Sequence, residues 1–107
     1  MAVEILKGER DDIMGQIEAV LETYQRDHVK AQITMYRQNS MSVRIRIIDP
    51  DFTGMSKADR NDLVWNYLDR LAEDAQADVS VLLLLTPSET PKSFANMEFE
   101  DPVPSTL

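Results

Sequence analysis

Residues 52–68 read FTGMSKADRNDLVWNYL, and this stretch decides the fold of the 107-residue chain. Gly54 lies in a tight turn before a helical pattern, where a backbone angle that other residues resist is expected. Ser56 and Asp59 are spaced like a helix-capping pair, with Asp in place of the usual Glu or Gln. A long helix is then predicted to about residue 75, with a buried stripe made of Leu63, Val64, Tyr67, Leu68, Leu71 and Ala75.

Upstream of this stretch, apolar and polar residues alternate with a period of two, which predicts β-strands. The runs 29–36 and 41–47 flank a polar turn at 37–40, the pattern of an antiparallel hairpin with one solvent-facing side. Pro50 should end the second strand, because proline cannot continue the ladder of hydrogen bonds. Ahead of the hairpin, apolar residues three and four apart predict an amphipathic helix over about 11–25.

Downstream, the segment 79–85, VSVLLLL, predicts a third strand that stops at Thr86-Pro87. A strand–helix–strand connection normally crosses right-handed and would place this strand parallel to the second. The predicted fold is therefore an α/β (α+β) domain of order α-β-β-α-β, with a three-stranded mixed sheet and helices packed on one face. The domain is expected to span residues 1–87, and residues 88–107 are expected to form an acidic, proline-containing tail.

Composition narrows the classes of function. The absence of cysteine excludes disulfides, thiolate catalysis and Cys-ligated metal sites. No segment has the apolar length of a signal peptide or a membrane span, so we expect a cytoplasmic protein that does not enter a membrane. With one histidine and no glycine-rich phosphate loop, no catalytic set is recognisable, and we expect no enzyme activity.

The charge distribution indicates one candidate binding surface. The net charge of −8 opposes nucleic-acid binding on average, but residues 29–60 carry six of the 11 bases and only three of the 19 acids. These bases are predicted on the solvent-facing side of the second strand, in the hairpin turn and at the start of the long helix. The candidate surface for a partner or for nucleic acid comprises Arg37, Arg44, Arg46, Gly54, Lys57 and Arg60.

The last predicted strand suggests a second surface. Strict alternation places Leu82 and Leu84 on the face opposite Val79, Val81, Leu83 and Leu85. A sheet with helices on one face should be polar on the other, so we expect Leu82 and Leu84 either to form an apolar interface or to be covered by the tail. The tail offers Phe94, Met97 and Phe99 for that covering, and a homodimer through sheet faces or edges is an alternative.

In two segments the chain resembles the BolA family. The family's central motif has the form F-x-G-x-S, an Arg four residues later, an apolar pair, an aromatic residue and a Leu. A second motif, T-P-x-E, ends the family's last strand and is matched by residues 86–89. The resemblance covers about residues 10–90, and the central motif is matched by Phe52, Gly54, Ser56, Arg60, Leu63, Val64, Trp65 and Leu68.

This resemblance implies a class II KH-like fold and a role as a partner of monothiol glutaredoxins in iron handling. Family members that share an iron–sulfur cluster use a His near the start of the last strand and a His or Cys between the first two strands. Here those regions are 76–79, QADV, and 37–40, RQNS, and neither contains His or Cys. The single histidine, His28, matches neither position and is expected at a helix end, so we expect neither a metal nor another cofactor.

Three functions remain open from the sequence. The first is a non-enzymatic BolA-like protein-interaction domain with a glutaredoxin-type partner and no metal ligands of its own. The second is a KH-like transcriptional or stress regulator that grips nucleic acid through Gly54–Lys57, a glycine loop in which Lys57 replaces the second glycine. The third is a self-associating structural domain.

Overall fold

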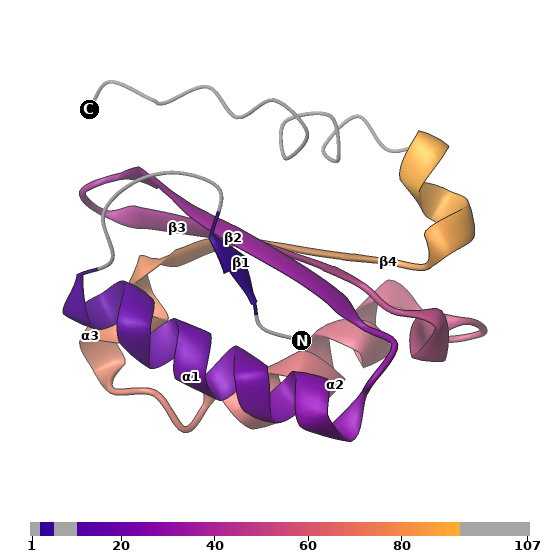
Figure 1. Ribbon diagram of the computed structural model, residues 1–107, viewed down its shortest axis with the longest axis horizontal. Helices are drawn as coiled ribbons and strands as arrows, with labels where there is room; N and C mark the ends of the chain where they lie inside the picture. Colours follow the sequence, from indigo (N-terminus) through magenta and orange to yellow (C-terminus); the bar gives the residue numbers. More distant parts are fainter. Residues whose placement is uncertain (1–2, 6–10, 93–107) are drawn as a thin grey trace.

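The computed structural model describes residues 3–5 and 11–92, except for the side chain of residue 92. These residues form a mixed α/β fold with a four-stranded mixed sheet and three α-helices (Figure 1). Two short 3₁₀ helices accompany them. In chain order the elements are β1 (Glu4–Ile5), α1 (Asp12–Asp27), β2 (Gln32–Asn39), β3 (Ser42–Ile48), η1 (Pro50–Phe52), α2 (Lys57–Leu68), α3 (Glu73–Asp78), β4 (Val79–Leu85) and η2 (Pro87–Lys92).

The strands lie in the order β1-β2-β3-β4. The predicted antiparallel pairing of β2 and β3 is confirmed, and the last strand, β4, lies parallel to β3 as expected. The expectation that one side of the hairpin faces solvent was wrong, because Thr34, Tyr36 and Arg46 on that side are buried. The prediction of three strands was wrong. The fourth strand, β1, pairs parallel to β2 through only two residues, Glu4 with Thr34 and Ile5 with Met35, and a strand that short shows no alternation in the sequence.

Helix α1 forms as its sequence predicts. The Asp11 side chain accepts a hydrogen bond from the Met14 amide at 2.9 Å, which caps the helix N-terminus. Met14, Ile17, Leu21 and Tyr24 recur at helical spacing and are fully buried. Each such side chain stabilises the fold by about 2 kcal/mol through the removal of apolar surface from water.

All three helices cover the same face of the sheet, as predicted (Figure 1). The helix expected to continue to residue 75 is instead broken: α2 ends at Leu68, Ala72 is extended with ψ 157°, and α3 begins at Glu73. Leu71 and Ala75 are nevertheless buried in the core, so the apolar spacing continues across the break. No Gly or Pro occurs at the break to signal it in the sequence.

A β-bulge at the start of β4 reverses the faces predicted for this strand. Val79 pairs with Val43, but the next pair joins Val81 to Arg44, so Ser80 is an extra residue. The extra residue shifts the alternation of all later side chains to the opposite face.

The expectation that Leu82 and Leu84 lie on the face away from the helices was therefore wrong. Leu82 pairs with Ile45 and Leu84 with Ile47 on the helix-facing side. Leu84 belongs to the hydrophobic core and Leu82 packs against it, so neither offers an apolar interface on the opposite face. The residues proposed to cover them, Phe94, Met97 and Phe99, lie outside the described residues.

No α-helix in the described ranges is both long enough and apolar enough to cross a lipid bilayer.

Candidate functional site

The exposed segment 53–59, here called the α2 loop, joins η1 to the first turn of α2. Gly54 has a φ of +82°, in the left-handed region that favours glycine, which confirms the predicted turn. The Ser56 side chain accepts a hydrogen bond from the Asp59 amide at 3.1 Å and caps α2, also as predicted. Phe52 is fully buried beneath the loop. The loop is thus exposed and yet fixed at both ends.

Arg60 holds the α2 loop from below. Its side chain is only 8% exposed, although the sequence placed it on a binding surface. Its Nε donates to the Met55 carbonyl at 3.1 Å, and its Nη1 donates to the Leu84 carbonyl at 3.2 Å. The guanidinium also lies 5.7 Å from the centre of the Phe52 ring. Arg60 therefore connects the loop to β4 and is largely buried.

Glu89 completes this connection, and sequence reasoning did not single it out as a site residue. Its two carboxylate oxygens accept hydrogen bonds from Arg60 Nη1 at 2.7 Å and Nη2 at 3.1 Å. The Thr86 amide donates to the same carboxylate at 2.8 Å. The bonds from Arg60 and then from Thr86 lower the pKa of Glu89 to about 2. Glu89 lies two residues beyond residue 87, where the domain was predicted to end. Its bonds to Arg60 join the two segments that resemble the BolA family, 52–68 and 86–89.

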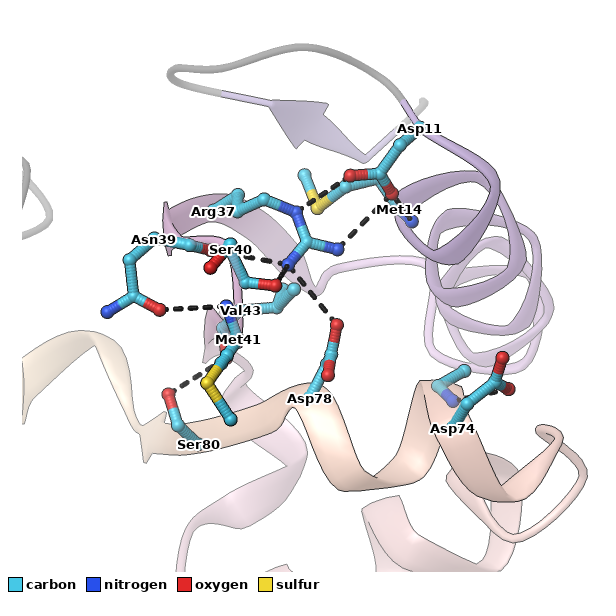
Figure 2. Close-up of polar contacts among 11 residues, drawn as sticks. Asp11, Met14, Arg37, Asn39, Ser40, Met41, Val43, Asp74, Asp78 and Ser80 are labelled. Atoms are coloured by element: carbon cyan, nitrogen blue, oxygen red, sulfur yellow. Dashed lines mark hydrogen bonds and ion pairs between the residues drawn. The ribbon is translucent and has the colours of Figure 1, made fainter. Parts of the chain in front are cut away.

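Arg37 was predicted in the hairpin turn, but it lies within β2 and points toward the helices (Figure 2). Its guanidinium contacts two carboxylates, Asp11 at 2.8 Å and Asp78 at 3.2 Å. The contact of Nε with Asp11 is an ion pair whose N–H is not aligned as a hydrogen bond. Nη1 also donates to the carbonyls of Asn39 and Ser40, both at 3.3 Å. We call Arg37, Asp11 and Asp78 the Arg37 clamp.

The Arg37 clamp joins the two regions where the BolA family would place its cluster ligands. Residues 37–40 and 76–79 are far apart in sequence, and the Arg37–Asp78 ion pair brings them together. The hydrogen bond from the Met14 amide, followed by the 3.2 Å hydrogen bond from Arg37 Nη2, holds the pKa of the Asp11 carboxyl below its usual value. The position that resemblance would assign to metal ligands is therefore filled here by an ion-pair network.

The arginines of β3 lie on the sheet face away from the helices. Arg44 donates from Nε to the Gln38 side chain at 2.8 Å and from Nη1 to the Tyr36 hydroxyl at 3.3 Å. Arg46 is 8% exposed and donates to the Thr34 hydroxyl at 3.0 Å. The expected basic surface is thus divided among three places, and of its six residues only Gly54 and Lys57 are exposed.

His28 caps the C-terminal end of α1, as predicted, but it also joins a group that sequence reasoning missed. Its Nδ1 lies 2.8 Å from Asp51 Oδ2 and 3.5 Å from Asp49 Oδ2. The ring stacks on Tyr24 at a centroid distance of 4.2 Å. The two aspartates flank Pro50, and the sequence indicated only that this segment ends a strand.

Asp49 is the buried centre of this group and is fully excluded from solvent. Its Oδ2 accepts a hydrogen bond from the Tyr24 hydroxyl at 2.7 Å, and its Oδ1 accepts one from the Asp51 amide at 2.9 Å. Burial, followed by the bond to Asp49, raises the pKa of the Tyr24 hydroxyl. One imidazole and two carboxylates at this spacing can share a proton or ligate a cation.

Comparison with known proteins gave no match to a family model, to a curated protein or to a solved structure. The likeness to the BolA family rests on the residues quoted above.

Proposed function

We propose that this chain is a non-enzymatic BolA-like interaction domain that binds a protein partner of the glutaredoxin type through the α2 loop. One observation carries the proposal: from Thr53 to Asp59 the loop is exposed, apart from half-buried Met55, while Phe52 and Arg60 anchor it underneath. A surface that is ordered before binding loses little conformational entropy on association, which favours affinity.

The order of elements supports a BolA-like or class II KH-like assignment. After α1 and the β2–β3 hairpin, the chain forms the short helix η1, turns at Gly54, continues as α2 and returns as β4 beside β3. On this assignment, the α2 loop would correspond to the glycine loop of a KH-like domain. The added strand β1 and the break before α3 depart from the simple order.

Charge favours a protein partner over nucleic acid. A nucleic-acid surface needs several lysines or arginines that can reach phosphates. Within the α2 loop Lys57 is the one basic residue, and the exposed acids Asp51, Asp59 and Asp62 lie on or beside the loop. Most of the arginines predicted for this role bond to groups within the fold.

The Arg37 clamp supports binding without a shared cluster. Arg37 and Asp78 stand in the two regions that would supply cluster ligands in the family, and they pair with each other at 3.2 Å. A guanidinium and a carboxylate held this way offer no soft ligand to iron. Contact with the partner would then depend on the protein surface alone.

Calorimetric titration of the full chain with a cluster-free monothiol glutaredoxin tests the proposal. Lys57→Glu should weaken binding by about tenfold, the effect of roughly 1.4 kcal/mol. Lys30→Glu makes the same charge change at an exposed residue outside the loop and should leave the affinity unchanged. Equal affinities for the two variants, or no binding by the unaltered chain, would contradict the proposal. Salt-sensitive binding to short DNA or RNA would instead favour the nucleic-acid alternative.

A further inference from the structure

We propose that His28, Asp49 and Asp51 form a binding site for a divalent transition-metal cation, beyond the proposed partner-binding function. His28 is the C-cap of α1, Asp49 is the N-cap of η1, and Asp51 lies within η1. One ligand atom from each, His28 Nδ1 and an oxygen of each aspartate, lies within 4.8 Å of the other two. Donors that converge from two separate elements make a site that folding assembles in advance.

The electrostatics of Asp49 are an independent reason to place a cation here. Its carboxylate is fully buried, and buried charges in proteins are paired or coordinate metals. Asp51 adds a second carboxylate beside it. Among the described residues, His28 is the sole basic side chain within ion-pair distance of either carboxylate, and no lysine or arginine balances them. A divalent cation would supply positive charge beside these two carboxylates.

The surroundings suit a cation that keeps part of its hydration shell. Asp49 is held by Tyr24 and by the Asp51 amide, so one ligand is already oriented by neighbours of the kind that support metal ligands. The Asp51 side chain is 57% exposed, which leaves the outer side of the site open to water. One imidazole nitrogen with two carboxylate oxygens favours zinc or a similar first-row ion over the magnesium ion, which prefers oxygen ligands.

Coordination would replace the hydrogen bond between His28 and Asp51. Nδ1 lies 2.8 Å from Asp51 Oδ2, closer than the separation of about 3.3 Å that two ligands have across a tetrahedral zinc ion. Zinc binding would therefore part these atoms slightly and release any proton that they share.

Because the chain has a single histidine, its ring gives one set of imidazole signals in a nuclear magnetic resonance spectrum. Zinc added to the full chain should shift the His28 ring nitrogens at one equivalent, and magnesium at the same concentration should not. In calorimetry, His28→Asn and Asp51→Asn should each lower zinc affinity by more than about tenfold. Asp69→Asn, a matched change at an exposed aspartate at the end of α2, should have no effect.

The outcomes separate the metal site from a simple ion pair. If His28 signals respond to pH but not to zinc, the group is an ion pair and the proposal fails. Equal zinc affinity in His28→Asn and the unaltered chain would also overturn it. Asp49→Asn is left out of the test because Asp49 is buried and its replacement could unfold the chain. A negative result in these zinc experiments would not bear on the proposed binding through the α2 loop, because the test of that binding uses no metal.

Discussion

Arg60 and Glu89 form a two-pronged ion pair, with Nη1 2.7 Å from Oε1 and Nη2 3.1 Å from Oε2. The pair lies beneath the α2 loop and joins α2 to η2. Since Arg60 also bonds to carbonyls of the loop and of β4, it connects three separate segments of the chain.

Loss of Arg60 should therefore destabilise the fold strongly. We expect Arg60→Met, which keeps most of the apolar stem, to lower the free energy of unfolding by about 3 kcal/mol, because it removes the bonds from the buried guanidinium to the Met55 and Leu84 carbonyls and to Glu89. Urea unfolding followed by circular dichroism measures the loss. Arg26→Met, at an exposed arginine of α1, serves as the control and should change stability by less than about 0.5 kcal/mol. Equal effects of the two changes would refute the structural role of Arg60.

The same ion pair should make the free energy of unfolding depend on pH. The folded-state pKa of Glu89, about 2, lies below its ordinary value of 4.5, so its contribution is complete above pH 4.5 and is lost as the pH falls through about 2. Because the carboxylate is 41% exposed, solvent screening limits that contribution to about 1 kcal/mol.

Comparison of the unaltered chain with Glu89→Gln over this pH range isolates the effect. The unaltered chain should be more stable at neutral pH, and the difference should shrink as the pH approaches 2. A difference that stays constant with pH would show that the pKa of Glu89 is not lowered in the folded chain.

The sequence predicts those parts of the fold that depend on interactions between residues close together in the chain. The hairpin, the turn at Gly54 and the cap at Ser56 are local, and each is present as expected. The faces of β4 were assigned wrongly because a single extra residue, Ser80, shifts the alternation, and no Gly or Pro marks the bulge. A one-residue shift reverses every later side chain in a strand.

The candidate sites were harder to predict than the fold, because their residues meet only in the tertiary structure. Arg60 and Glu89 are 29 residues apart, and His28 and Asp51 are 23 apart. The arginines were expected on a surface because charged residues are mostly exposed. Their burial depends on carboxylates and carbonyls from distant segments, which one sequence does not reveal.

Gly54 and Gly15 offer a matched test of the turn. Neither has a neighbouring atom within 4 Å of the position that a β-carbon would occupy, so alanine meets no steric clash at either. Gly54→Ala should cost about 1 kcal/mol, because its φ of +82° strains an L-residue. Gly15→Ala lies within α1 and should stabilise the chain by roughly 0.5–1 kcal/mol. Thermal unfolding gives both values, and effects of the same sign would contradict the left-handed turn.

The Arg37 clamp can be tested with a double-mutant cycle. Arg37→Met and Asp78→Asn remove the two partners of the 3.2 Å ion pair, and we expect a coupling free energy of about 1 kcal/mol. A second cycle that pairs Arg37→Met with Asp59→Asn should show additive effects, because Asp59 belongs to the start of α2 and forms no bond to Arg37 in the structure. Additivity in the first cycle would show that the Arg37–Asp78 pair contributes no stability.

Chemical-shift mapping of the full, isotope-labelled chain during titration with a cluster-free monothiol glutaredoxin tests the central claim most directly. The largest amide shifts should fall on residues 53–59, because the α2 loop is exposed and fixed by Phe52 and Arg60. The hairpin end at Ser40 and Met41 should shift little. Shifts centred on the hairpin, or the absence of any shift at saturating partner, would contradict the account.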